Sequence, residues 1–113
     1  MGTENTIAKN TYTEYTFPNG NTVKCTVAFR YLLKLREKNK RIYQKMNDGL
    51  LLGVKELAES AYILYGAYLC ACYAGENGGE DNIIPEGEFI EALEDDLIAV
   101  MLKCTEFINK KKN

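Results

Sequence analysis

The feature that most constrains this chain is an uncharged apolar segment from Ser60 to Gly75, which contains four tyrosines. The segment is shorter than the roughly 20 residues that a helix needs to cross a bilayer. A helix that is apolar on nearly all sides must instead be covered by other parts of a protein. We therefore expect a helix over about 50–74 that is either the centre of the fold or one side of an oligomer interface.

The pattern of this helix predicts which of its residues form the core. Apolar residues recur at intervals of three and four, and small residues form a narrow edge beside them. A neighbouring helix can approach closely along that edge. The predicted core stripe comprises Leu51, Val54, Leu57, Ala61, Leu64, Tyr68 and Cys72, and the edge comprises Ala67, Ala71 and Ala74.

A β-hairpin is predicted over 11–26, before the helices. Two strand-like segments flank Pro18-Asn19-Gly20-Asn21, and an Asn-Gly pair suits a tight reversal. Two strands alone are marginally stable in water, so the hairpin must pack on helices or extend a sheet made with another chain. We expect 1–10 to be loose or disordered. The 113-residue chain is long enough for one core, so 11–113 is predicted to form a single helical domain.

A basic amphipathic helix is predicted over about 27–47, with Thr26 as its N-cap and Asn39 interrupting its apolar stripe. Gly49, after Asn47 and Asp48, is expected to end it in a left-handed conformation. The apolar stripe comprises Ala28, Leu32, Leu35, Ile42 and Met46. The opposite face is basic and has Glu37 as its single acidic residue. Its basic residues are Arg30, Lys34, Arg36, Lys38, Lys40, Arg41 and Lys45.

An acidic helix is predicted over about 85–110. Pro85 suits the first helical position, and Glu86 and Glu88 lie where the helix dipole favours anions. The predicted buried face comprises Phe89, Leu93, Leu97, Val100, Met101, Cys104 and Ile108. Because one helix is basic and another acidic, the two are expected to pair within the chain or to steer association between chains.

The composition argues against catalysis. The chain has no histidine, which removes the commonest general base and the usual partner of a nucleophilic Ser or Cys. The glycines match no phosphate-binding loop. The acidic segment Glu76–Glu88 lacks the EF-hand spacing. Glu91 and Asp95 share a helix face, but the sequence supplies no further ligands beside them. We therefore expect no enzyme, no cofactor and no metal.

The four cysteines are Cys25, Cys70, Cys72 and Cys104. Cys70 and Cys72 are two residues apart on a helix and so point to nearly opposite sides, which excludes a local redox pair. The spacing is not that of a secreted disulfide scaffold. A zinc site would require all four thiolates to converge without a CxxC motif. Buried reduced thiols in a cytosolic protein are the favoured interpretation.

Nucleic-acid binding is the main alternative from another class. Arg30, Lys34, Lys38 and Arg41 would supply the phosphate contacts. The formal net charge of −2 and the acidic third helix oppose this interpretation. No helix-turn-helix spacing follows the basic helix.

The order of these elements resembles a known family. The segments that carry the resemblance are the hairpin turn with its strands, Tyr15-Thr16-Phe17-Pro18-Asn19-Gly20-Asn21-Thr22-Val23-Lys24, the start of the basic helix, Phe29-Arg30-Tyr31-Leu32-Leu33-Lys34-Leu35, and Ile84-Pro85-Glu86-Gly87-Glu88-Phe89-Ile90-Glu91-Ala92-Leu93-Glu94-Asp95-Asp96-Leu97. With the apolar helix between them, these segments are similar to the tail assembly chaperones of long-tailed phages that infect Gram-positive bacteria.

This resemblance implies a non-enzymatic, mainly α protein with a three-helix core and a short N-terminal hairpin. It implies a chaperone in the cytoplasm of the bacterial host that binds the helical tape-measure protein and helps tail-tube subunits assemble, and we expect it to self-associate. A structural head–tail connector component is a further alternative. The residues predicted to bind protein are Arg30, Lys34, Arg41, Leu64, Tyr68, Glu91 and Asp95.

Overall fold

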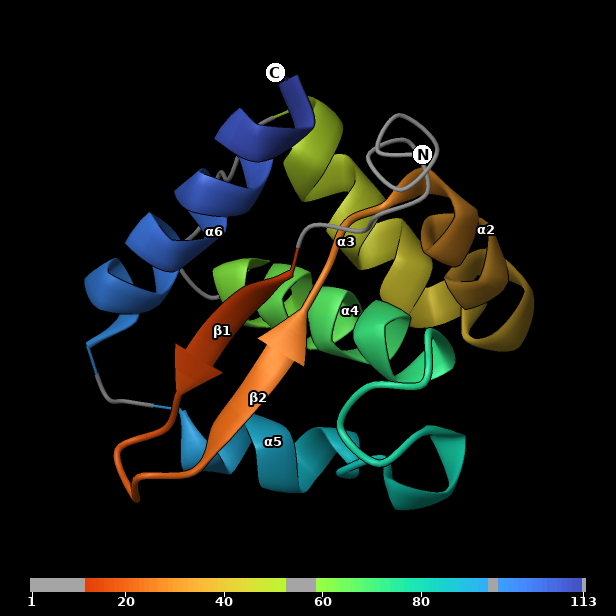
Figure 1. Cartoon of the computed structure of the whole chain (residues 1–113). Coiled ribbons are helices and arrows are strands. Elements are labelled where there is room, and N and C mark those ends of the chain that lie inside the picture. Colours follow the sequence, from red (N-terminus) through yellow and green to blue (C-terminus); the bar gives the residue numbers. More distant parts are fainter. Residues whose placement is uncertain (1–11, 53–58, 94–95, 113) are drawn as a thin grey trace, which may run out of the picture.

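The computed structural model describes residues 12–52, 59–93 and 96–112 (Figure 1). The described part is mainly helical with a two-stranded antiparallel hairpin at its N-terminal end, which confirms the predicted fold class. The predicted behaviour of residues 1–10 lies outside the described residues.

The hairpin consists of β1 (Thr13–Thr16) and β2 (Thr22–Cys25). The turn between them is closed by the Gly20 N–H, which donates to the Phe17 carbonyl at 2.9 Å, and Gly20 adopts φ +96°. This positive φ is the left-handed conformation that the Asn-Gly pair predicted. Tyr15 and Phe17 point into the core, whereas Glu14 is exposed.

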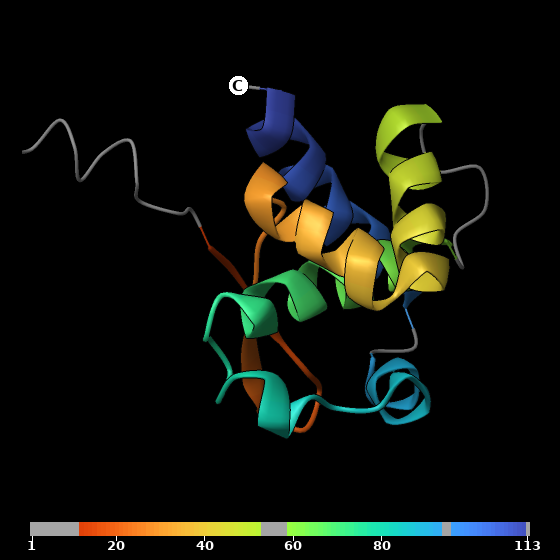
Figure 2. The same ribbon diagram turned by 90° about the vertical axis from the view of Figure 1, so that its right-hand side faces the viewer.

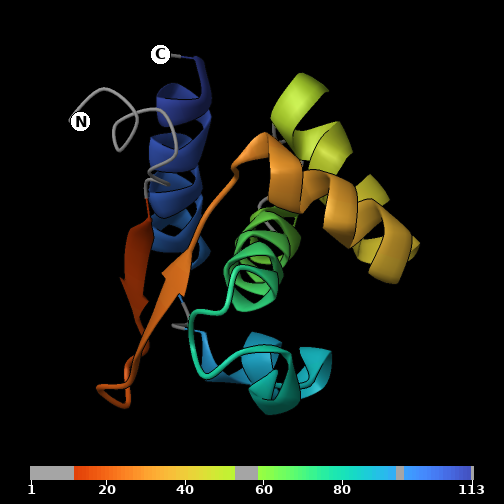
Figure 3. The same ribbon diagram turned by 45° about the vertical axis from the view of Figure 1, so that its right-hand side comes forward.

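Helix α4 (Glu59–Tyr73) is the centre of the fold, as its apolar sequence predicts. Figures 2 and 3 show it between α2, α3 and α6 on one side and α5 on the other, with the hairpin across it. From Ser60 to Cys72, every residue except Tyr62 is buried. Helix α3 approaches it closely at Gly66, where an added Cβ would lie 2.5 Å from the Met46 sulfur. The missing side chain of Gly66 therefore permits this helix contact.

The predicted basic helix is two helices, α2 (Phe29–Lys38) and α3 (Lys40–Leu52). Asn39 breaks it with φ −152° and ψ 77°. Its N–H donates to the Leu35 carbonyl at 2.7 Å, and its side-chain Oδ1 accepts the Ile42 N–H at 3.2 Å. Asn39 therefore ends one helix and caps the next. Four of the five predicted stripe residues, on both sides of this break, are buried: Leu32, Leu35, Ile42 and Met46. The fifth, Ala28, is half-buried.

The predicted boundary at Gly49 is wrong, because α3 continues to Leu52. Gly49 is buried inside the helix, where an added Cβ would lie 2.5 Å from Ile63 Cδ1. A close helix contact therefore explains this glycine. Leu51 was predicted to lie in the core stripe of 50–74 but is 73% exposed at the end of α3. The predicted core residues Val54 and Leu57 lie outside the described residues.

The predicted acidic helix is also divided, into α5 (Glu86–Ala92) and α6 (Leu97–Lys112). Leu93 takes ψ 154° and ends α5, and its side chain stays buried. Asp96 begins α6, since its Oδ1 accepts the Ile98 N–H at 3.0 Å. A short 3₁₀ turn, η1 (Glu80–Asn82), lies between α4 and α5. Two of the three predicted helices, the basic one and the acidic one, are therefore each divided beside a local capping residue.

Two predicted helix starts are displaced by one or two residues. Ala28, not Thr26, is the N-cap of α2, and the Thr26 hydroxyl accepts the Ala28 N–H at 3.2 Å. Pro85 is the N-cap of α5 instead of its first helical residue. Its carbonyl accepts the Phe89 N–H at 2.9 Å.

Candidate protein-binding surfaces

The basic surface is formed by α2 and the start of α3. Lys34 is exposed and has no ion pair within the described part of the chain. The Arg30 guanidinium lies 5.7 Å from the centre of the Tyr31 ring. Arg41 forms an ion pair with Glu86. Of the three basic residues predicted to bind protein, Arg30 and Lys34 are therefore the ones without an ion pair among the described residues.

Ion pairs connect the basic elements to the acidic segment that follows α4. Lys24 Nζ lies 3.3 Å from Glu76 Oε1, and Lys38 Nζ lies 3.2 Å from Glu80 Oε1. With Arg41–Glu86, these pairs join three basic residues to residues 76–86. The charge division seen in the sequence is thus partly neutralised within one chain. The acidic partners belong to the loop and to α5, and the described part of α6 supplies none of them.

Two tyrosines of α4 hold the end of this acidic segment. The Tyr65 hydroxyl donates to the Ile84 carbonyl at 2.8 Å, and the Tyr68 hydroxyl accepts the Ile84 N–H at 2.8 Å. Burial and, to a smaller extent, the nearby Glu86 carboxylate raise the pKa of Tyr65 to about 12. Burial also raises the pKa of Tyr68. Both hydroxyls therefore stay protonated at neutral pH and fix the chain just before α5.

The predicted binding residues Leu64 and Tyr68 lie in the core. Leu64 is fully buried and Tyr68 is 1% exposed. The Tyr68 ring packs against Phe89 at a centroid distance of 5.0 Å, and Phe89 also meets Phe17 at 5.2 Å. The hairpin, α4 and α5 thus share one aromatic cluster. The chain's own elements therefore cover the surface of α4 around Leu64 and Tyr68, the two residues of this helix that were predicted to bind protein.

Helix α6 has apolar residues on two opposite sides. Val100 and Cys104 are fully buried, and among the described elements α6 makes its main contact with α4 (Figure 3). Ile98 and Leu102 are one turn apart on the outer side and are 54% and 59% exposed. These two side chains define the α6 outer face. An amphipathic surface helix normally places polar residues there, so this face is available for contact.

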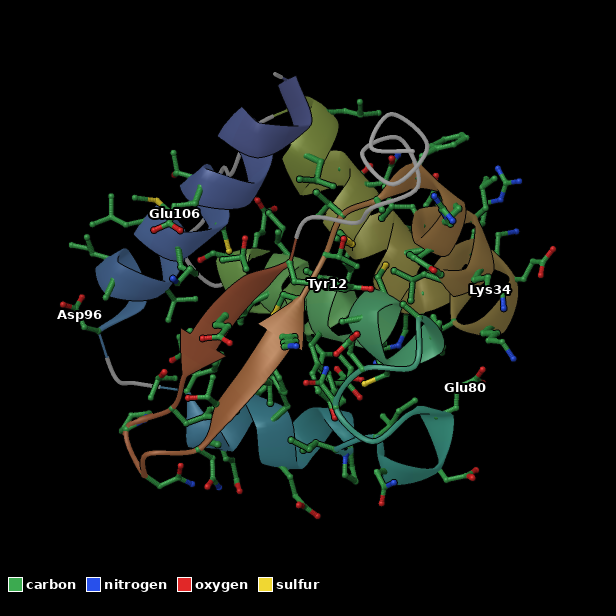
Figure 4. The ribbon with its side chains drawn as sticks, in the orientation of Figure 1. Tyr12, Lys34, Glu80, Asp96 and Glu106 are labelled. Carbon is green, nitrogen blue, oxygen red and sulfur yellow. The ribbon has the colours of Figure 1, made fainter. Side chains whose placement is uncertain are left out.

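Acidic residues flank the α6 outer face. Asp96 and Glu106 are exposed, at the start and in the middle of the helix. Figure 4 shows them on the side of the molecule opposite Lys34. Glu91, a predicted binding residue, is exposed on α5. Asp95, the other acidic one, lies outside the described residues. The structure therefore does not bring the six described residues of the predicted set into one site.

The cysteine side chains lie in the interior of the fold. All four cysteines are buried, and none forms a disulfide with another. Burial raises the pKa of Cys104 to about 12 and raises those of Cys25 and Cys72. These thiols stay protonated at neutral pH and are therefore poor nucleophiles. Among the described residues, no group of three or more cysteines or carboxylates could hold a metal ion.

Sequence patterns predicted the buried residues Val100 and Cys104 of α6 but missed the exposure of Ile98 and Leu102. The predicted core residue Met101 is half-buried, and the side chains of Leu97 and Ile108 lie outside what the structure describes. Ile98 and Leu102 are both aliphatic and lie within the apolar segment Leu97–Leu102. All six residues from 97 to 102 are apolar, whereas one buried stripe needs apolar residues only at every third or fourth position. This continuous apolar segment could have indicated a second apolar side of the helix. Which of its sides is covered depends on how α6 docks on α4.

Comparisons with protein-family models, curated proteins and solved structures found no match to this chain. Within the described ranges, no helix combines the length and apolar character that crossing a membrane requires.

Proposed function

We propose that this protein is a non-enzymatic assembly chaperone that binds the tape-measure protein of a long-tailed phage in the cytoplasm of the bacterial host. Its further partners in this role are tail-tube subunits. The proposal combines the family resemblance, which extends from the hairpin turn to the acidic helix, with the exposed apolar surface of α6.

The α6 outer face is the observation that carries this proposal. Ile98 and Leu102 are more than half exposed, although water disfavours large aliphatic side chains at the surface. The Thr105 hydroxyl donates to the Met101 carbonyl at 3.1 Å, which pairs this polar group within the helix itself. A second helix that placed an apolar stripe along Ile98 and Leu102 would remove both side chains from water.

The charges around this face favour a partner that carries basic residues. Asp96 and Glu106 are exposed at its flanks, and Glu106 also forms an ion pair with Lys103, whose Nζ lies 3.6 Å from Glu106 Oε1. A helix that carries basic residues beside its apolar stripe therefore complements the face. A long helical protein such as a tape-measure protein offers many segments of this kind, and it needs covering until the tail tube surrounds it.

The test is co-purification of the full chain with the co-expressed tape-measure protein. Ile98→Asp combined with Leu102→Asp places charges on the α6 outer face, and we expect capture of the partner to fall at least tenfold, as for a buried apolar contact centre. The matched control is Leu51→Asp, the same kind of change at an aliphatic residue that is 73% exposed on α3. Circular dichroism verifies that both variants fold.

Three outcomes would overturn the proposal. No capture by the unmodified chain removes the tape-measure protein as the partner. Equal losses in the α6 variant and in Leu51→Asp would show that the α6 outer face is not the contact. Recovery of the protein from finished virions would favour a structural component such as a head–tail connector.

Nucleic-acid binding is not proposed as a second function. Two of its four predicted contact residues, Lys38 and Arg41, form ion pairs with Glu80 and Glu86. Phosphate would have to compete with these carboxylates.

A further inference from the structure

The outer edge of β2 is closed by the rest of the chain. The Asn77 side-chain amide pairs with the backbone of Lys24, accepting its N–H at 2.8 Å and donating to its carbonyl at 2.9 Å. Asn77 adopts φ +59° to do so. Two residues further along the chain, just after β2 ends, the Thr26 N–H donates to the Ala67 carbonyl of α4 at 3.0 Å. An amide side chain and a helix thus occupy the positions that a third strand would take.

The outer edge of β1 differs. Glu14 lies opposite Lys24, and Thr16 lies opposite Thr22. The N–H and C=O groups of Lys24 point away from β1, so Lys24 and Glu14 form a pair without hydrogen bonds between the two strands. In such a pair the backbone groups of both residues point outward, and the same holds for the pair Thr16–Thr22, two positions along. The backbone groups of Glu14 and Thr16 therefore point away from β2. Within the described chain, no hydrogen bond to the backbone of Glu14 or Thr16 closes this edge. Both residues are exposed.

The β1 edge has only two of the features that usually prevent strand pairing: the strand is four residues long, and Glu14 is charged. From Thr13 to Thr16 it contains no lysine, proline or bulge, and its one charge is Glu14. A two-stranded sheet is marginal by itself, and each added strand increases its stability. In Figure 1 the closed side of the hairpin faces the loop after α4, and β1 forms the other side.

We propose that two copies of this chain pair through their β1 edges, in antiparallel orientation about a two-fold axis, to form a four-stranded sheet with the order β2-β1-β1-β2. The inference is independent of the proposed function and rests on the backbone groups of β1, not on the α6 outer face. A second copy is the occupant because a two-fold axis at Tyr15 makes the edge complementary to itself. Glu14 of each copy then lies opposite Thr16 of the other, not opposite the second Glu14.

This register supplies roughly four backbone hydrogen bonds, two in each Glu14–Thr16 pair. The alternative register that places the two Glu14 residues opposite each other brings like charges together, which is unfavourable. Charge therefore selects the register, and the same charges provide its test.

The first experiment introduces a charge at Thr16 on the open strand or, as a control, at its neighbour Thr22 on the closed strand. Thr16→Lys faces Glu14 of the second copy and is expected to tighten the dimer roughly threefold to tenfold, whereas Thr16→Glu weakens it by a similar factor. Thr22→Lys and Thr22→Glu are the matched controls. Thr22 is also exposed and shares the 2.8 Å hydroxyl hydrogen bond with Thr16, but it lies on the closed strand. Sedimentation equilibrium of the full chain gives the dimer dissociation constants.

The second experiment removes a backbone donor. Glu14→Pro deletes an N–H that the hairpin does not use, and each dimer then loses two hydrogen bonds, which weakens it roughly tenfold. Hydrogen exchange gives an independent measurement, since the amide protons of Glu14 and Thr16 should become more protected as protein concentration rises.

A chain that remains monomeric up to millimolar concentration would overturn the inference. So would a dimer that responds equally to the Thr16 and Thr22 substitutions, or one that Glu14→Pro leaves unchanged. None of these outcomes depends on capture of a tape-measure protein, so the two proposals can fail separately.

Discussion

Helices α4 and α6 are similar in length, with 15 and 16 residues, and both contain long apolar segments. The fold covers α4 on all sides, whereas α6 has one side on α4 and leaves Ile98 and Leu102 exposed. An apolar sequence therefore shows that a helix needs covering, and the number of neighbouring elements determines whether the chain itself supplies it. On α6 the uncovered residues are the surface that we assign to a partner.

The contrast between α4 and α6 predicts that substitutions at the centre of α4 have the largest effect on the free energy of unfolding. Leu64→Ala removes a fully buried side chain and should lower the free energy of unfolding by about 2–5 kcal/mol, because packing is lost and a cavity remains. Urea denaturation measures the change. A loss below about 1 kcal/mol would show that α4 is not the centre of the core.

A smaller effect is expected where α3 contacts α4. Gly66→Val places carbon atoms against the Met46 sulfur and should cost about 1–3 kcal/mol. Gly87→Ala is the control, since an added Cβ there meets no atom within 4 Å inside helix α5. Alanine favours helix over glycine, so this control should stabilise the protein by about 0.5–1 kcal/mol. Equal destabilisation by both changes would contradict the close contact at Gly66.

The tyrosine contacts to Ile84 predict a pH effect of intermediate size. The pKa of Tyr65 rises from 10.0 when exposed to about 12 in the folded chain. The folded state therefore holds this proton more tightly, and the stabilisation is complete below pH 10 and is lost as pH rises from 10 to 12. Tyr65→Phe should cost about 1 kcal/mol at neutral pH through the lost hydrogen bond. It should also reduce the alkaline loss, which denaturation at several pH values measures; an unchanged pH profile would exclude this role for Tyr65.

The smallest effect on stability is expected on the α6 outer face. Ile98→Ala and Leu102→Ala remove side chains that are already more than half exposed, so the free energy of unfolding should change by less than about 0.5 kcal/mol. The same variants should bind the tape-measure protein more weakly. Thermal denaturation beside the co-purification assay separates the two effects. A large loss of stability would indicate that these residues are part of the core.

The sequence alone was enough to predict the mainly helical fold class, the hairpin with its turn at Gly20 and the burial of α4. These features depend on local patterns: the period of the apolar residues, the turn residues and the length of an uncharged segment. It also identified most of the buried residues, such as Phe89 and Leu35. The division of the basic and acidic helices was missed, because Asn39 and Asp96 act as caps only when the chain direction changes beside them.

Only the tertiary structure decided which surfaces remain available. Leu64 and Ile98 are both aliphatic residues on apolar helices, yet one is buried and the other is 54% exposed. Glu14 and Lys24 face each other across the hairpin, yet Asn77, which is 53 positions away from Lys24, closes one edge and leaves the other. Burial and edge pairing depend on contacts between distant segments, and a local pattern carries no information about which segments meet.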